Sequence, residues 1–447
     1  MQDLYVFVPQ KSPRTVYAFK LIFDCVLPST FNLHFTRRWK GFLAQNGPKI
    51  SYGRSGATAA LLIPNSGFLH ETSFRPFMPQ VKGQGENSIL FPEDSDADLN
   101  FDLPAAVFYL ASRYEEYHCA STDAHGRFQS TESLAARHQF LDWPIVHLWV
   151  NQLYSALRKK FPALPKQQKK FDFLSTIDID NGFKYRGKPL WRNIAGLFLD
   201  GLKFRGSAIQ YRFRMLFMQK ADPYDNYRWI RRQAKRNKVD VRIFVMHCQK
   251  GKYDHAVEPQ HADYAELIQK LKKIGRVGLH PSYNCLHNPA QLIAEKKGLQ
   301  AQLKGDKMLH LRRHFLRLNM PDSFRQAYEI GFRHEHSMGY SDVPGFRAGI
   351  SVSYPFFDLL QNRQLPLTVH PFAAMETAFR YYSHETSEQA FAKIELLMRR
   401  VHKYGGRFIS VWHDRSFSRE SEARPWAELY RSHLELAREL KEGKSSV

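Results

Sequence analysis

Phe171-Asp-Phe-Leu-Ser-Thr-Ile-Asp-Ile-Asp180 is an apolar stretch that ends in two carboxylates two residues apart. If it forms a β-strand, Asp178 and Asp180 lie on one face, about 6 to 7 Å apart along the strand, because side chains alternate across the pleat. Two carboxylates this close repel each other unless a proton or a cation lies between them. The spacing fits a metal ligand beside a general base. It also fits a solvated strand end before a turn at Asn181-Gly182.

Four further stretches share the character of a buried strand with a polar end. Each is a short apolar run that ends in a histidine: Val239–His247, Arg276–His280, Leu365–His370 and Gly406–His413. A helical pattern from Thr386 to Tyr404 precedes the last of them and stops at Gly405-Gly406, a common helix exit. Strands that alternate with helices predict a parallel sheet, and the fold class is therefore α/β.

Polar residues at the ends of parallel strands are typical of a β/α barrel, in which these ends surround one mouth. The side chains expected to converge there are Asp178, Asp180, His247, His280, His370 and His413. A single histidine at a strand end is more often a core or surface residue, but several beside an acid pair favour a shared metal site. Oxygen and nitrogen donors without thiolates suit zinc or another divalent transition metal.

Length and composition predict two domains. A single hydrophobic core stops growing at roughly 250 to 300 residues, and this chain has 447. A hydrophobic fraction of 43% excludes a mainly disordered chain. We expect a smaller α+β domain at 1–158, a basic, proline-containing linker at 159–170 and the barrel at 171–440. The first domain shows no catalytic spacing. Its polar cluster Asp123, His125 and Arg127 either reaches a ligand or belongs to a loop held by its own hydrogen bonds.

The cysteines and the hydropathy pattern predict a cytoplasmic protein. The four cysteines are widely scattered and form neither a disulfide framework nor a thiolate zinc motif: Cys25, Cys119, Cys248 and Cys285. The N-terminus lacks the basic and apolar regions of a signal peptide, and no stretch reaches the roughly 18 apolar residues of a membrane span.

The formal net charge of +22 predicts an anionic partner. Basic residues are densest between residues 184 and 220, where large apolar residues interleave with them. This segment fits an interfacial helix at a membrane surface, a groove for an anionic substrate, or a pair of ordinary surface helices. No homeodomain, zinc-finger, RNP or basic-zipper pattern is present, so no specific nucleic-acid partner is expected.

Three motifs resemble those of a known family. Thr176-Ile-Asp-Ile-Asp180, Val277-Gly-Leu-His-Pro-Ser-Tyr283 and Ile409-Ser-Val-Trp-His413 look like the first, second and last motifs of the polysaccharide deacetylases with the NodB-homology fold, carbohydrate esterase family four. The match covers most of residues 171–420. It implies a distorted β/α barrel of the NodB type that hydrolyses an N-acetyl group on a sugar or polysaccharide precursor.

The resemblance also implies a metal site, with Zn²⁺ as the expected ion. The later acid of the first motif, Asp180, and the first histidine of the second motif, His280, bind the metal in the family. The family's second histidine, four residues further on, is replaced here by Asn284. His314, where the family has its Arg-Pro-Pro-Tyr motif, is the expected third ligand; the alternatives are His287, His334 and His336.

The remaining roles follow from the same resemblance. Asp178 is expected to be the general base and His413 the general acid. Arg313 or Arg347 is expected to keep Asp178 ionised and correctly aimed.

The whole chain resembles a bacterial, cytoplasmic group of deacetylase-like proteins with an uncharacterised domain before the barrel. The shared blocks are Ser112–Tyr117, Gly278–Tyr283 and Gly345–Gly349. Two other functions stay open, because a fold and its ligands do not fix the substrate. One is a different metal-dependent amide hydrolase, and the other is a degenerate barrel that only binds glycans or polyanions.

Overall fold

A computed structural model of the chain describes residues 2–27, 31–118, 121–187, 198, 209 and 222–443. The N-terminal part contains a four-stranded parallel sheet in the order β2-β1-β3-β4. Its strands are β1 (Gln2–Phe7), β2 (Phe31–Thr36), β3 (Lys49–Tyr52) and β4 (Leu61–Ile63), beside the small pair β5 (Val81–Lys82) and β6 (Ile89–Leu90). Its helices are α1 (Pro13–Lys20), α2 (Trp39–Leu43), α3 (Leu103–Ala111), α4 (Leu134–Arg137) and α5 (Ile145–Lys160).

The second sheet carries the strands that the sequence predicts to end at a common mouth. It has nine strands in the order β12-β13-β11-β10-β9-β8-β7-β15-β14. Their bounds are β7 (Phe171–Ile179), β8 (Asp240–Val245), β9 (Arg276–Leu279), β10 (His310–Leu311), β11 (His334–Glu335), β12 (Tyr354–Asp358), β13 (Arg363–Val369), β14 (Ala374–Met375) and β15 (Gly406–His413). The helices of this part are α8 (Tyr227–Asn237), α9 (Ala262–Lys272), α10 (Pro289–Gln302), α11 (Asp322–Glu329), α12 (Ser387–Tyr404) and α13 (Arg424–Glu442).

The predicted α/β fold with a parallel sheet is confirmed. All neighbouring pairs of the large sheet are parallel except β12 and β13. Within the described part of the chain, the edge strands β12 and β14 are not paired with each other, so hydrogen bonds do not close this sheet into a barrel. The antiparallel β12 occupies the edge next to β13.

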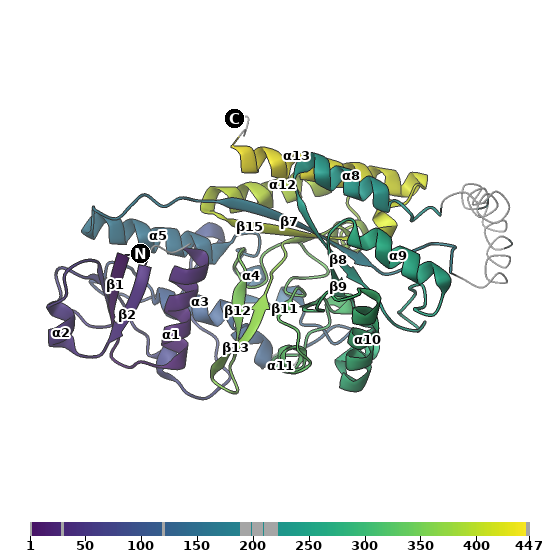
Figure 1. The fold of residues 1–447 in the computed structure, drawn as a ribbon. Helices are drawn as coiled ribbons and strands as arrows, with labels where there is room; N and C mark the ends of the chain where they lie inside the picture. Colours follow the sequence, from purple (N-terminus) through teal and green to yellow (C-terminus); the bar gives the residue numbers. More distant parts are fainter. Residues whose placement is uncertain are drawn as a thin grey trace.

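Strand β7 is central because its two faces differ as the sequence predicts. Phe173 packs in the core, where its ring stacks on Phe408 of β15 with centroids 6.1 Å apart. The opposite face carries Asp178, which pairs in register with His413 of β15. Helices α8, α12 and α13 lie along the outer face of β7 and β15 (Figure 1). The apolar face is thereby buried, and the carboxylates point to the inner side of the sheet.

Helix α12 begins and ends where the sequence indicates. Thr386 and Gln389 form a reciprocal capping box at its start, which satisfies two backbone N–H groups. Gly405, with φ of +81°, follows its last residue. The chain then enters β15 directly, which fixes the position of His413 at the end of that strand.

The N-terminal part packs against β12 and β13 through one continuous hydrophobic core. The Tyr17 hydroxyl donates to the Pro355 carbonyl at 2.7 Å, and the Tyr17 ring contacts Phe357 with centroids 5.0 Å apart. Such packing orients the two parts relative to each other. The division into domains at 159–170 stays a prediction.

Two predictions concern segments that the structure describes only in part. Of the basic segment 184–220, only residues 184–187, 198 and 209 are described, so the fit of this segment to a partner stays a prediction. Among the helices that are described, none is both long and apolar enough to cross a membrane.

Candidate active site

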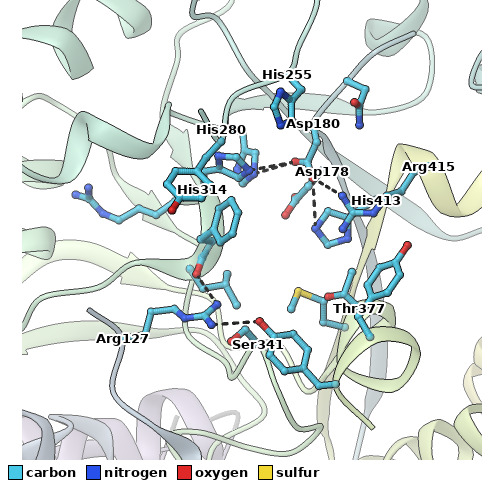
Figure 2. Close-up of a pocket in the computed structure, with 18 of the residues that line it drawn as sticks. Arg127, Asp178, Asp180, His255, His280, His314, Ser341, Thr377, His413 and Arg415 are labelled. Carbon is cyan, nitrogen blue, oxygen red and sulfur yellow. Dashed lines mark hydrogen bonds and ion pairs between the residues drawn. The ribbon is translucent and has the colours of Figure 1, made fainter. Parts of the chain in front are cut away.

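The end of β7 places two carboxylates at the bottom of a cavity. Asp178 and Asp180 are 2% and 9% exposed. The cavity has a volume of about 490 Å³ and opens at the carboxyl ends of the parallel strands (Figure 2). The predicted residues Asp178, Asp180, His280, His314 and His413 all line it, together with Arg127, Tyr253, Phe315, Tyr381, Tyr382 and Arg415.

Asp180 and two histidines form a compact donor group. Asp180 Oδ1 lies 3.4 Å from His280 Nε2 and 3.9 Å from His314 Nε2. One ligand atom from each residue lies within 4.8 Å of the other two. Asp180 Oδ1 is buried and forms no hydrogen bond. An unpaired buried carboxylate oxygen facing two imidazole nitrogens fits a divalent cation, and this donor set is one that zinc accepts.

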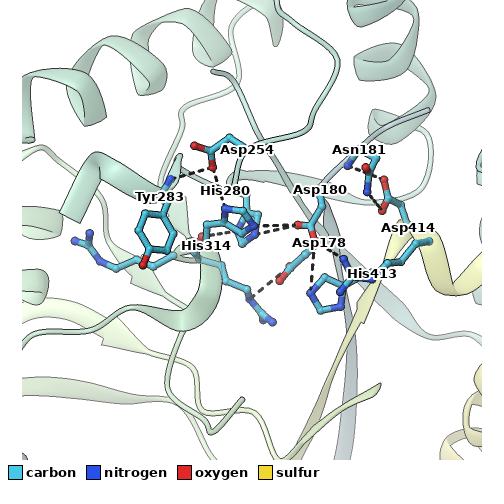
Figure 3. Close-up of polar contacts among 12 residues, drawn as sticks. Asp178, Asp180, Asn181, Asp254, His280, Tyr283, His314, His413 and Asp414 are labelled. Atoms are coloured by element: carbon cyan, nitrogen blue, oxygen red, sulfur yellow. Dashed lines mark hydrogen bonds and ion pairs between the residues drawn. The ribbon is translucent and has the colours of Figure 1, made fainter. Parts of the chain in front are cut away.

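The other nitrogen of each imidazole is already engaged. His280 Nδ1 lies 2.7 Å from the Arg312 carbonyl, which only accepts, so Nδ1 carries the proton. His314 Nδ1 lies 3.0 Å from Asp254 Oδ1 (Figure 3). The Nε2 lone pairs of both rings therefore face the space beside Asp180. In metal sites, outer-shell hydrogen bonds to the other ring nitrogen orient the histidine ligands in this way. No pattern in the sequence indicates Asp254, because it lies in a loop without periodicity.

The charges around Asp180 favour its ionised form. Burial alone would raise its pKa, but His413, His280, His314 and Arg415 outweigh burial and hold the pKa of Asp180 well below its usual range. Arg415 Nη1 lies 3.1 Å from Asp180 Oδ2. The Asp180 carboxylate is therefore present at neutral pH as a charged ligand.

Arg312, rather than Arg313 or Arg347, faces Asp178. Its Nε lies 3.7 Å from Asp178 Oδ1, and both side chains are buried. Arg313 also lines the cavity, but its guanidinium donates to the Ser323 carbonyl and to Gln326 instead of to Asp178. Strand parity would have identified Arg312, since residues two apart share a face and His314 lies two positions further on.

The other predicted arginine, Arg347, binds Glu116 instead of Asp178. It forms a bidentate ion pair with Glu116, at 2.6 and 2.8 Å, and donates to the Gly339 carbonyl at 3.0 Å. Glu116 belongs to the Ser112–Tyr117 block, so this pair connects that block with the Gly345–Gly349 block. Because both charges are buried and satisfied by each other, Arg347 holds the two parts of the chain together and does not reach Asp178.

His413 stands across the cavity from the two metal-facing histidines. Its Nδ1 lies 2.8 and 3.0 Å from the two oxygens of the buried Glu376, which also accepts from Ser416 at 2.8 Å. Its Nε2 points into the cavity, 4.0 Å from Asp180 Oδ2. Burial lowers the pKa of His413, but Glu376 and Asp180 more than offset burial and raise it to about 9. His413 is therefore protonated at neutral pH.

The turn after β7 is held by Asp414, which directly follows the neighbouring strand β15. Asp414 accepts hydrogen bonds from the backbone N–H groups of Asn181 and Gly182, at 3.0 and 2.7 Å. Gly182 has φ of +76°, and a Cβ there would lie 2.5 Å from Leu267. The turn at Asn181-Gly182 thus exists, and it belongs to the site rather than replacing it.

A loop of the N-terminal part forms one wall of the cavity. Arg127 is bound to Asp123 at 2.6 Å, and it also donates to the Phe315 carbonyl at 3.1 Å and to the Tyr382 hydroxyl at 3.2 Å. His125 contacts the Tyr283 hydroxyl at 3.0 Å. The loop is therefore held by its own hydrogen bonds, and Arg127 also lines the cavity (Figure 2). That the cluster reaches a ligand stays a prediction.

Two of the strand-end histidines do not reach the cavity. His247 binds the Tyr264 hydroxyl at 3.0 Å, on the helix side of the sheet. His370 stacks on His336, with centroids 4.2 Å apart, in a separate cluster of rings. Of the alternative third ligands, His287 contacts Arg317 at 3.4 Å, and His334 lies in the same separate cluster. Of the four candidates, only His314 lies beside Asp180.

Comparisons with known proteins assign no activity to the chain. A model of the family of unknown function DUF7033 matches residues 4–162, which precede the sheet that carries the site. No curated protein matches the chain.

Two solved structures are similar at low levels. A protein from Mycobacterium smegmatis, described as a putative polysaccharide deacetylase, aligns with a TM-score of 0.37 and 12% identity, over 64% of this chain and 94% of that one. A 4-α-glucanotransferase from Thermococcus litoralis aligns with a TM-score of 0.31 and 13% identity, over 62% of this chain and 38% of that one. Both similarities are too low to indicate an activity.

Proposed function

We propose that the protein is a metal-dependent hydrolase that removes an N-acetyl group from a sugar or polysaccharide precursor, on a distorted barrel of the NodB type. The observation that carries this proposal is the unpaired, buried Oδ1 of Asp180 facing His280 and His314, beside Asp178 and His413. A divalent cation held by Asp180, His280 and His314, with Zn²⁺ the best suited, would polarise the acetyl carbonyl and lower the pKa of water toward about 7.

Asp178 is proposed as the general base. It lies two residues before Asp180 on the same face of β7, so it reaches the same volume of the cavity. The guanidinium of Arg312 lies beside it, with Nε 3.7 Å from Asp178 Oδ1, and gives this buried carboxylate a cationic partner. Asp178 would take the proton of the water that attacks the acetyl carbon.

His413 is proposed as the general acid. Glu376 binds Nδ1, so the imidazolium directs its Nε2–H into the cavity. Cleavage of the amide expels an amine, which leaves only when it gains a proton. His413 would donate that proton, a step worth about 10² to 10⁴ in rate. Glu376 acts through His413, as a positioning residue.

Release of acetate is the direct test of the function. We expect the zinc-loaded protein to release acetate from N-acetylated chito-oligosaccharides or from a nucleotide-linked N-acetyl sugar, as measured by a coupled acetate assay. A chelator should abolish release, and added zinc should restore it. Zinc binding without acetate release from any such substrate, but with retention of the glycan, would instead favour a glycan-binding module.

Glu376→Gln is expected to shift the alkaline limit of activity to lower pH. With the pKa of His413 raised to about 9, the acid form persists to that pH and is lost above it. Removing the negative charge of Glu376 should return this pKa toward the ordinary value of about 6.5 and move the alkaline limb of kcat/KM down by at least about one pH unit. The matched control Glu428→Gln, on the exposed face of α13, should keep the parent profile. Identical profiles for all three proteins would exclude His413 as the acid.

The proposal also includes a negatively charged partner and a cytoplasmic location. The net charge of +22 supports a substrate or carrier with negative charge, bound through the basic segment 184–220 or at an anionic membrane surface. Cys25, Cys248 and Cys285 are free thiols, which supports a reducing compartment and therefore the cytoplasm.

A further inference from the structure

A second set of charged side chains lies at the opposite end of the large sheet from the candidate active site. Arg242 of β8 and Arg276 of β9 are direct partners in the parallel register. Arg276 lies four residues before His280, so the two share the inner face of the sheet at different levels. Strand β9 therefore begins with Arg276 and leads to the metal-facing His280 at its other end.

Neither arginine has a carboxylate partner among the residues that the structure describes. Arg242 Nη1 contacts His336 Nε2 at 3.3 Å, and its Nε is buried without a hydrogen bond. Burial lowers the pKa of Arg242, and the like charges of Arg276, Arg407 and Arg312 lower it further to about 10, against an opposing effect of Asp240. Like charges held together without counterions are a source of repulsion that an anion would relieve.

Four histidines extend this group of cationic and donor side chains. His310 and His334 stack with centroids 4.3 Å apart, and His310 Nδ1 lies 3.2 Å from His336 Nε2. His334 Nδ1 lies 3.1 Å from His370 Nε2. Within the described ranges, these rings do not bring three donor atoms within 4.8 Å of one another, as Asp180, His280 and His314 do. The donor atoms of these histidines therefore do not converge as the ligands of a metal ion do.

Two cavities open onto this group. One, of about 350 Å³, is lined by Arg242, Arg276 and Arg407, and the other, of about 520 Å³, is lined by Arg276, Lys272, Lys307 and His310. They share Gly275 and Arg276, so they adjoin. Three carboxylates line these cavities. Asp172 is bound to Arg407 at 2.6 Å and to Lys441 at 3.4 Å, Asp306 is bound to Lys272 at 3.2 Å, and Asp240 forms no ion pair within the described residues. Arg242 and Arg276 are left to bind something else.

We propose that this basal cluster, defined as Arg242, Arg276 and His310 with the cavities beside them, binds a tetrahedral oxyanion, either free phosphate or the phosphate group of an ester. Two guanidinium groups on adjacent strands supply planar N–H donors that match phosphate oxygens, and His310 adds a ring nitrogen. The adjoining cavities leave room for the organic part of an ester. This site is separate from the proposed metal site and does not depend on the proposed function.

Calorimetric titration of the full, chelator-treated protein in 150 mM sodium chloride tests this proposal, because without metal a phosphate has no cation to bind at Asp180. The probes are inorganic phosphate and glucose 1-phosphate. Saturable binding at one site is expected, and Arg276→Gln should weaken it by about tenfold or more, since a charge-assisted contact is lost. Arg276 is exposed at the start of β9, so this variant should fold.

A matched variant separates the site from the general positive charge of the protein. Arg37→Gln removes one exposed arginine of the N-terminal part and should leave the affinity unchanged. Tighter binding of glucose 1-phosphate than of phosphate would identify a phosphate ester as the ligand, and equal binding would identify free phosphate. Absence of saturable binding, or equal affinity in the parent, Arg276→Gln and Arg37→Gln proteins, would overturn the proposal.

Discussion

Asp178→Asn is expected to lower kcat by about 10² to 10⁴ while leaving zinc binding intact, because it removes a proton acceptor and keeps the shape of the side chain. Asp178 is not among the three residues whose donor atoms converge in the cavity. Its nearest charged partner is Arg312, at 3.7 Å, rather than a histidine of the donor group. Acetate release and calorimetric zinc titration on the same preparation measure the two effects separately.

The variant also leaves the buried Arg312 without its counterion, which lowers stability. Its thermal unfolding must therefore be compared with that of the parent, and activity is meaningful only below the transition. Asp322→Asn is a matched control, because the side chain of Asp322 is 69% exposed at the start of α11. Wild-type kcat in a folded Asp178→Asn protein would remove Asp178 from the mechanism.

Asp180→Ala and His314→Ala are each expected to weaken zinc binding by at least about 100-fold, since losing even an outer-shell partner of a metal ligand costs about 10- to 100-fold. The parent, stripped with a chelator, should bind one zinc ion in a calorimetric titration. The two residues lie on different strands, with Asp180 after β7 and His314 after β10. Only the folded sheet brings them within reach of one ion.

His287→Ala is the matched control for this experiment. His287 is an alternative third ligand by sequence, but in the structure it contacts Arg317 instead of Asp180. Zinc binding should therefore be unchanged. If His287→Ala lost the metal and His314→Ala kept it, the assignment of the third ligand would be reversed. If the parent bound no zinc, a degenerate barrel that binds glycans would explain the fold better than a hydrolase.

Patterns in the sequence are sufficient to predict the strands that lead to Asp178, His280 and His413, the α/β class and the faces of these strands. Periodicity of two residues places Asp178 and Asp180 on the face opposite Phe173, and the structure has them there. The capping residues of α12 and the glycine after it define that helix to within one residue. These features depend on neighbours along the chain, so a linear pattern contains them.

The sequence pattern also singled out residues of the candidate site at strand ends, because all parallel strands point the same way. Asp180, His280 and His413 each follow or end a strand of the large sheet and line one cavity. The same reasoning failed for His247 and His370, because a strand-end side chain can turn to either face after the last paired residue. Their partners, Tyr264 and Ser353, come from elsewhere in the fold.

The tertiary fold determines which side chains outside the motifs complete the site. Arg312 instead of Arg313 faces Asp178, Asp254 orients His314, and Glu376 holds His413. It also placed Arg347 on Glu116, between the two parts of the chain. These contacts join residues far apart in the sequence, and they depend on strand order and on how the chain turns between strands. Local sequence patterns do not contain these long-range distances, because the packing of the whole core determines them.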